Sequence, residues 1–432
     1  MEYTNTVPHL KTLNIGTPSI LEAKLIYHRA EIESWFKHEF MNQSILLTTS
    51  VDIRNAQYKL SPIDTNIFPA GFNNLSPELY LTAAGAFKHA LKQFHQNCKR
   101  ILIVPENHTR NPGYFESLAV LKNILMLAEF DVQVGSLLEI EKPLEVETSL
   151  GLLTLHPTFT DNRRLKINNF DPCMLLLNND LSDGIPNILK NIRQPIMPSI
   201  HLGWTHRTKD LHAQHYEEIA QKFASHFSFD PWLIMPYFES CHNVDFMTRE
   251  NESLLIDKAT NVFENIQKKY QEHNINEKPF LVIKSSQGTY GMAVIAINNP
   301  EEIKQFNRKQ RKKMSQSKGR QVVNQVLIQE GVYTKESINH TASAEPVVYM
   351  IGNQVIGGFY RFHAQKTSSE VLNTPGMEFQ PLTFEDCCNL PNDRNQEHDW
   401  HDKFYVYSII ARLALLATCH ESTALGENID EA

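Results

Sequence analysis

The 432-residue chain is poor in cysteine and contains no long apolar stretch. Its six cysteines, of which Cys387 and Cys388 are adjacent, form no CxxC pair that would suggest zinc. So few cysteines do not make a disulfide framework, and we expect reduced thiols. No apolar run approaches the roughly 20 residues of a membrane helix, and the first residues lack the pattern of a signal peptide. We therefore expect a soluble cytoplasmic protein.

The chain also lacks an excess of positive charge. Its 41 Lys and Arg residues are outnumbered by 49 Asp and Glu residues, so the formal net charge is −8 at pH 7. This balance argues against binding to nucleic acid or to acidic membranes. One basic block, RKQRKKMSQSKGR at 308–320, is an exception to this acidic charge balance. We interpret this block as a solvated helix end and loop, and the alternative is a patch for nucleic acid or an acidic ligand.

Helix and strand patterns alternate in the first half of the chain, which is long enough overall for two or three domains. We expect helices at 83–98 and 114–129, and strands at 100–105, 131–137 and 174–177. This order predicts a βαβ-type unit with a parallel sheet. Further helices are expected near 216–226 and 256–270.

From residue 279 onward the pattern changes to short strands. They are expected at 280–284, 292–297, 326–329, 347–351 and 355–361, with a reversal at Asn353. Residues 404–419 predict an amphipathic closing helix, and 421–432 a loose tail.

A lysine and a glycine-rich loop follow the first of these strands. Lys284 ends the strand, and the loop SSQGTYG runs to Gly291. Glycines let a loop turn its N–H groups toward phosphate oxygens, and a lysine adds positive charge. The P-loop motif GxxxxGK[ST] is absent and no helix follows directly. Alone, the segment is equally consistent with a β-hairpin that has a glycine turn.

The order of the later segments makes this signal more specific. The strand at 326–329 enters a polar hinge that can receive an adenine edge, and a hairpin then begins with Glu345 and ends with Arg361. A lysine strand with a glycine loop, then a hinge, then an acid-to-arginine hairpin resembles the order in ATP-grasp enzymes, glutathione synthetase in particular.

A closer resemblance is to the proteobacterial-type glutamate–cysteine ligases. It rests on segments spread over residues 45–418: DIRN at 52–55 with Lys59, PIDTNIFPAGFNN at 62–74, ENHTRN at 106–111, LNNDLS at 177–182, GW at 203–204, GTYGM at 288–292, LNTPGM at 372–377 and ARLALL at 411–416. The family implies ATP- and Mg²⁺-dependent formation of γ-glutamylcysteine through an acyl phosphate, the first step of glutathione synthesis. The partners are then the small molecules glutamate and cysteine.

The resemblance also implies the fold. We expect an α/β protein, α+β in part and ATP-grasp-like, with an N-terminal parallel-sheet domain and a two-lobed ATP-binding region. The predicted domains are a substrate-binding domain at 1–200, a central lobe with the glycine loop at 201–335 and a C-terminal lobe at 336–432.

Candidate residues follow for ATP, the metal and phosphoryl transfer. The ATP candidates are Lys284, Gln287, Gly288, Thr289, Tyr290, Gly291, Gln329, Glu330 and Val332. Mg²⁺ requires oxygen ligands, so Glu345, Glu370 and Asn373 are the metal candidates. Lys284 and Arg361 are the catalytic candidates, because positive charge stabilises a transferring phosphoryl group. The alternative for Arg361 is an ion-paired residue at a strand end.

The polar segment 52–74 suits a zwitterionic amino acid, which needs both charges and amides; the alternative is a hydrogen-bonded loop that caps a domain. The substrate candidates here and in the segment after residue 105 are Arg54, Lys59, Asn66, Asn73, His108 and Arg110. Arginines favour a carboxylate through their fork geometry, and His108 is equally consistent with a loop hydrogen bond. We interpret Trp204 and Arg207 as structural.

The chain departs from the family pattern beside the glycine loop. Ser285-Ser286-Gln287 stands where small residues around an aspartate are expected, Ala293 replaces a glycine, and Glu378 is unusual. Two other functions therefore stay open: an ATP-grasp ligase of other amino acids, and a non-catalytic nucleotide-binding module.

Overall fold

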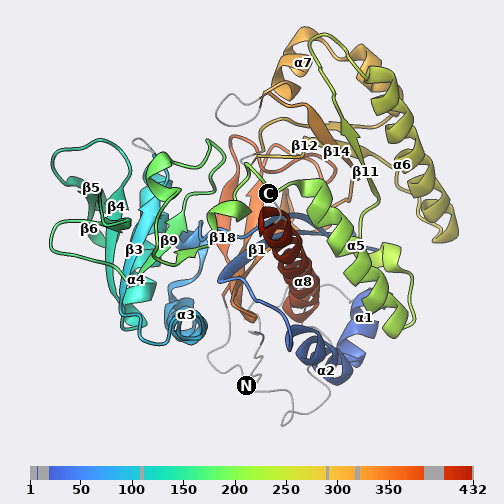
Figure 1. Cartoon of the computed structure of the whole chain (residues 1–432). Coiled ribbons are helices and arrows are strands. Elements are labelled where there is room, and N and C mark those ends of the chain that lie inside the picture. Colours follow the sequence, from blue (N-terminus) through green and yellow to red (C-terminus); the bar gives the residue numbers. More distant parts are fainter. Residues whose placement is uncertain are drawn as a thin grey trace.

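The computed structural model describes residue 7 and residues 19–107, 111–288, 291–316, 322–383 and 403–430. Three sheets form a mixed α/β fold, and Figure 1 shows them spread across the molecule with the C-terminal helix in front of the middle one. Short 3₁₀ helices connect them: η1 (Phe72–Asn74), η2 (Pro77–Leu79), η3 (Asn187–Leu189), η4 (Ile200–Leu202), η5 (Pro231–Ile234) and η6 (Pro300–Gln305). In the described part of the chain, no helix is both long and apolar enough to cross a membrane.

The first sheet contains the predicted parallel strands. Its order is β10 (Ile196–Met197), β9 (Met174–Asn178), β3 (Arg100–Pro105), β4 (Asp131–Ser136), β6 (Gly151–Pro157) and β5 (Leu144–Thr148). Strand β3 runs parallel to both β4 and β9, which confirms the βαβ-type prediction. Helices α3 (Tyr80–Phe94) and α4 (Pro112–Leu127) belong to the same core as this sheet. A separate hairpin joins β7 (Phe159–Asp161) and β8 (Arg164–Lys166).

The middle sheet joins the beginning of the chain to its C-terminal third. Its order is β18 (Glu378–Pro381), β17 (Gln354–His363), β16 (Ala342–Ile351), β1 (Thr48–Asn55) and β2 (Leu60–Asn66), and β15 (Ser337–Ile338) also pairs with β16. Strands β1 and β16 are antiparallel, with Val51 opposite Val348. Residues of the predicted domains 1–200 and 336–432 therefore share one sheet.

The third sheet is antiparallel, in the order β11 (Phe238–His242), β14 (Gln325–Glu330), β12 (Leu281–Ser285) and β13 (Val294–Ile297). Helix α6 (Glu252–Glu272) covers one face, where Ile283 and Ile328 are buried with Val262 and Ile266. Because side chains alternate along a strand, Lys284 and Gln329 project from the other face. Helix α7 (Arg308–Met314) holds most of the basic block and is largely exposed, as a solvated helix end predicts.

Helix α8 (Lys403–Asp430) corrects two expectations about the C-terminal end. It packs against α5 (Lys209–His226), β1 and β2, and α1 (Ile20–Tyr27) and α2 (Arg29–Phe40) also contact it. Residues 404–419 are buried all round, so the predicted amphipathic pattern is wrong; a helix apolar on every side belongs in a core. The predicted loose tail from 421 is also wrong, because the helix continues to Asp430 and Glu421 is buried.

One disulfide corrects the expectation of reduced thiols. Cys98 and Cys173 are bonded, with their Cα atoms 5.7 Å apart. They precede the neighbouring parallel strands β3 and β9, which brings them together at one edge of the sheet. Cys241 and Cys419 are free thiols, as expected, and both are buried. Cys387 and Cys388 lie outside the described residues.

A buried ion pair anchors the C-terminal half of α8. Glu421 Oε1 accepts a hydrogen bond of 2.7 Å from Arg207 Nε, and Glu421 Oε2 lies 3.1 Å from His212 Nδ1. Burial alone would raise the pKa of Glu421, but Arg207 and His212 outweigh it and lower the pKa to about 2.

We expect Glu421→Ala to lower the free energy of unfolding by about 3–5 kcal/mol, because it leaves Arg207 buried without its partner. The lowered pKa adds stability that is fully present above the ordinary value of 4.5 and is lost as pH falls toward 2. Urea unfolding between pH 3 and 7 measures both effects. The neighbouring Ser422→Ala variant is the control. If Glu421→Ala lowered the free energy of unfolding no more than Ser422→Ala does, the anchoring role of Glu421 would be contradicted.

Candidate active site

Two connected pockets lie where the third sheet faces the middle sheet. The larger encloses 740 Å³ between the glycine loop, the hinge and strands β1, β16 and β17. The smaller encloses 510 Å³ beside α5 and β11. Both are lined by Ile63, Asp64, Lys209, Lys284 and Gln329. We call them the hinge pocket and the α5 pocket.

Lys284 stands between the two pockets at the end of β12. Its Nζ donates a hydrogen bond of 2.7 Å to the carbonyl of Ile63 on β2. Burial lowers the pKa of Lys284 to about 8, and the nearby carboxylate of Asp64 opposes that effect. The side chain is therefore mainly charged at neutral pH, but it titrates close to it.

The glycine loop closes against the segment that carries Asn373. Gly288, Gly291 and Asn373 all line the hinge pocket. Gly291 has φ +65°, and a Cβ there would come within 2.3 Å of the Asn373 carbonyl oxygen. Only glycine accommodates both the left-handed backbone and this close approach. Thr289 and Tyr290 lie outside the described residues.

Two buried carboxylates and two arginines form the opposite wall of the hinge pocket. Arg361 Nη1 donates to Asp52 Oδ2 at 2.6 Å and to Glu345 Oε1 at 2.9 Å. Arg54 Nε donates to the other Glu345 oxygen at 3.0 Å. Burial raises the pKa of Asp52, although Arg361 pulls it down. We call Asp52, Glu345, Arg361 and Arg54 the charged centre.

Arg54 connects this charged centre to the hinge. Its Nη1 donates to the carbonyls of Val332 at 3.0 Å and Ser368 at 3.3 Å, and its Nη2 donates to the carbonyl of Glu370. The guanidinium thus binds four protein acceptors. This arrangement suits a residue that positions the pocket wall.

Lys59, also predicted as a substrate residue, is not among the residues that line the two pockets. Its side chain is buried, with Nζ 2.8 Å from Glu330 Oε2 and 4.0 Å from the centre of the Trp232 ring. The Glu330 carboxylate also accepts hydrogen bonds from Trp232 Nε1 and the Tyr237 amide. Glu330 borders the hinge pocket, whereas its carboxylate is bound within the fold.

The remaining predicted residues divide between the pocket and its surroundings. Gln329, Val332 and Asn373 line the hinge pocket. The Glu370 carboxylate instead binds Lys366 Nζ and the Thr367 amide, each at 2.9 Å, and that amide and Lys366 lower its pKa to about 2. Three further residues are not among the lining side chains: Gln287, Asn66 at the end of β2, and Asn73 in η1. His108 and Arg110 lie outside the described residues.

Asp52, Asp64 and Lys209 line the site but were not among the predicted site residues. Asp52 and Asp64 are cross-strand partners on β1 and β2. Lys209 Nζ lies 2.7 Å from Asp64 Oδ1 and 4.3 Å from the centre of the Trp204 ring. One signal for Asp52 was available in the sequence. Asp52 and Arg54 alternate with the apolar residues Val51 and Ile53, which places both charges on one face of a strand. Pairing of that strand with β16 was not visible locally.

The unusual loop residues contact an acid on another element. Ser286 Oγ donates to Asp210 Oδ1, and Gln325 Nε2 donates to Asp210 Oδ2 at 2.7 Å. The amide of Lys209 also donates to the Ser286 carbonyl at 2.8 Å. Ser286 thus attaches the loop to the first turn of α5, which carries the acid that the loop itself lacks.

Comparison with known proteins defines the class of this enzyme. A family model described as glutamate-cysteine ligase matches residues 22–422. A crystal structure at 1.90 Å of a candidate γ-glutamylcysteine synthetase from Methylobacillus flagellatus KT has 41% identity and a TM-score of 0.86, and the match covers 97% of this chain and 99% of that one. No curated protein matches the chain.

Two distant structures were also found. A glutathione synthetase-like effector from Globodera pallida has 9% identity and a TM-score of 0.37 over 79% of this chain and 81% of its own. D-alanyl-alanine synthetase A from Vibrio cholerae O1 has 10% identity and a TM-score of 0.34 over 73% of this chain and 81% of its own. Likeness at this level carries no argument.

The protein is therefore a ligase, an enzyme that joins two small molecules. The chain belongs to the glutamate–cysteine ligase family. This confirms the resemblance that its motifs predicted.

The structural role of Lys59 can be tested by its removal. We expect Lys59→Met to lower the free energy of unfolding by about 3–5 kcal/mol, because Glu330 is left buried without a cation. Lys59→Met combined with Glu330→Gln should recover part of this loss, since no uncompensated charge remains. The exposed Lys268→Met is the control and should stay within about 0.5 kcal/mol of wild type. A Lys59→Met protein with unchanged stability and a raised glutamate KM would instead support a substrate role.

Proposed function

We propose that the hinge pocket binds ATP with Mg²⁺ and that the enzyme forms γ-glutamylcysteine through an acyl phosphate. The γ-carboxylate of glutamate attacks the γ-phosphorus, ADP leaves, and the amine of cysteine then displaces phosphate from the acyl carbon. One observation carries this proposal: Lys284 and the glycine loop line the same pocket as the charged centre and face it.

The two ends of the hinge pocket match the two ends of ATP. Val282, Val294 and Leu372 provide apolar surface for an adenine ring beside the hinge. Lys284, Gly288 and Gly291 lie where positive charge and loop N–H groups are needed for phosphates. Arg361 is held by Asp52 and Glu345 at the opposite wall, and we assign it to the transferring phosphoryl group.

The oxygen ligands in this pocket fit Mg²⁺. Asp52 and Glu345 come close enough to share Arg361 Nη1, and Asn373 adds an amide oxygen from the facing loop. The raised pKa of Asp52 means that its carboxylate has less positive charge nearby than its burial requires. A divalent cation would supply that charge and would neutralise phosphate oxygens. We propose Asp52, Glu345 and Asn373 as ligands, with Asp52 replacing Glu370.

The α5 pocket suits the second amino acid. Asp64 and Lys209 present opposite charges at its junction with the hinge pocket, as the ammonium and carboxylate of an amino acid require. Its walls include Met235, Phe238 and Leu327, which offer an apolar surface. We propose that cysteine binds here, because its thiol tolerates apolar walls better than the second carboxylate of glutamate does.

The pKa of Lys284 predicts how ATP binding depends on pH. Lysine is charged below its pKa, so the ATP KM should rise as pH increases through about 8. Lys284→Ala should raise the ATP KM and lower kcat at pH 7, because one charge is lost from a partly dry site. Lys284→Arg keeps its charge at every pH used and should remove the inflection near 8. ADP release between pH 6.5 and 9.5 measures this, and an unchanged inflection in Lys284→Ala would exclude Lys284.

Product analysis tests the mechanism and the two amino-acid sites. Enzyme, ATP, Mg²⁺, glutamate and cysteine should yield one ADP for each γ-glutamylcysteine, because the γ-phosphoryl group is transferred; formation of AMP would refute the acyl phosphate. Asp64→Asn should raise the cysteine KM by at least about tenfold, with a smaller change in the ATP KM. An equal rise in the cysteine KM and the ATP KM would place Asp64 outside the cysteine site. ADP formation with other amino acids but none with glutamate would reject the substrate assignment.

A further inference from the structure

A group of metal-ligand side chains lies where α5 contacts α8, at positions of α5 adjacent to Tyr216 and Glu217, which line the α5 pocket. His215 and Glu218 are three residues apart on α5, so they share a face of that helix. His420 projects from α8. One ligand atom from each of the three residues lies within 4.8 Å of the others.

Neither ring nitrogen of His215 has a hydrogen-bond partner. Both nitrogens are buried. Nδ1 lies 3.6 Å from the Glu218 carboxylate, too far for a hydrogen bond, and the ring stands edge-on to His420 with centroids 6.1 Å apart. Buried polar atoms without partners are rare in folded proteins, and an ion is one common explanation.

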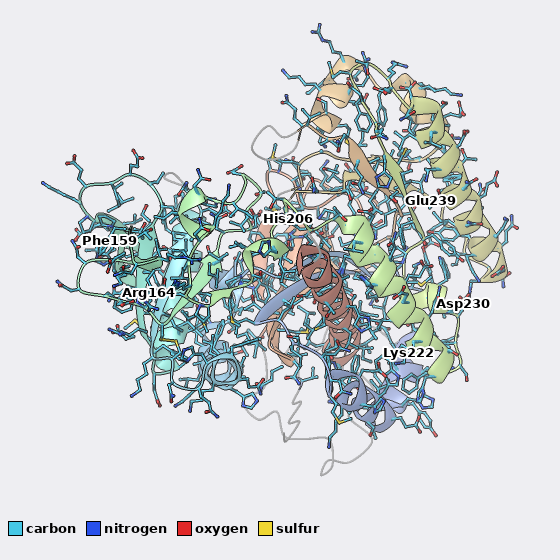
Figure 2. All side chains as sticks on the ribbon, viewed as in Figure 1. Phe159, Arg164, His206, Lys222, Asp230 and Glu239 are labelled. Carbon is cyan, nitrogen blue, oxygen red and sulfur yellow. A yellow bond between two sulfur atoms is a disulfide. The ribbon has the colours of Figure 1, made fainter. Side chains whose placement is uncertain are left out.

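Polar and charged side chains surround the ring of His420. Burial and the neighbouring His215 lower the pKa of His420. Its Nε2 lies 3.4 Å from Gln43 Nε2. Lys222, labelled on α5 in Figure 2, pairs with Glu39 at 2.7 Å, so its charge is already compensated.

A second group of this kind shows the opposite situation. In the described part of the chain it consists of Asp230, Glu272 and His273. Asp230 is labelled in Figure 2. Lys269 Nζ lies 2.8 Å from Asp230 and 2.7 Å from Glu272, so an ammonium already occupies the place of a cation. This group serves as an internal control.

We propose that His215, Glu218 and His420 bind a divalent transition metal of the zinc class, with solvent as a further ligand. Two imidazoles and a carboxylate are typical ligands of Zn²⁺. Glu218 is 70% exposed and gives the ion a path from solvent. Bound metal would connect α5 to α8 beside the pair of His212 and Glu421, and so would brace the helix that carries Lys209.

The test uses the full chain, stripped with EDTA and titrated with Zn²⁺ by calorimetry. We expect one Zn²⁺ per chain, a raised Tm and, with Co²⁺, the visible absorption of a four-coordinate site. Glu218→Gln, which is exposed and should not disturb folding, and His215→Asn should each weaken Zn²⁺ binding at least about tenfold and change the Co²⁺ spectrum. His273→Ala should leave both unchanged.

Binding that survives Glu218→Gln and His215→Asn would overturn the proposal, as would loss of binding in His273→Ala alone. The absence of any bound Zn²⁺ in the wild-type protein would do the same. Ligase activity with Mg²⁺ should persist in Glu218→Gln, so failure of this inference does not affect the proposed reaction.

Discussion

The pairing of two buried carboxylates with two arginines is the constraint on which the rest of the structure depends. Asp52 and Glu345 are removed from water, which is costly for charged groups without partners. Arg361 and Arg54 compensate them in part, and all four lie on strands of the middle sheet. The opposite face of β1 carries Val51 and Ile53 into the core under α8. A slip of one residue would therefore bury charge in that core and expose apolar groups in the pocket.

The same charges position the parts of the site that lie on loops. Arg54 reaches from Glu345 to the carbonyls of Val332 and Ser368, so the hinge and the loop before Asn373 depend on one guanidinium. Asn373 in turn lies against Gly291 of the glycine loop. Fixed dipoles and charges of this kind need little reorganisation when a substrate arrives, which is how enzymes obtain most electrostatic stabilisation. The proposed phosphoryl transfer requires such a preorganised centre.

The sequence was sufficient where local pattern or motif order decides the outcome. Strand β3 and its parallel neighbours followed from apolar runs and helix spacing, and the order from Lys284 to Arg361 led to residues that meet in one pocket. The pairing of side chains that are far apart in the chain could not be predicted from the sequence. Arg54 and Lys59 look alike as nearby cations, yet one faces the pocket and the other is bound to Glu330, 271 residues away. Glu421 resembled part of a polar tail because its partner Arg207 is 214 residues distant.

Lys284 connects the two pockets, and its burial couples ligand binding to protonation. Burial penalises the charged ammonium, which lowers its pKa to about 8. An anion placed beside it favours the charged form and raises that pKa again, so a polyphosphate and the proton on Lys284 stabilise each other. The carbonyl of Ile63 accepts a hydrogen bond from the ammonium, and β2 also carries Asp64, which borders both pockets. The charge state of this lysine therefore affects binding in both pockets: it acts on the phosphates of one proposed substrate and on the ammonium of the other.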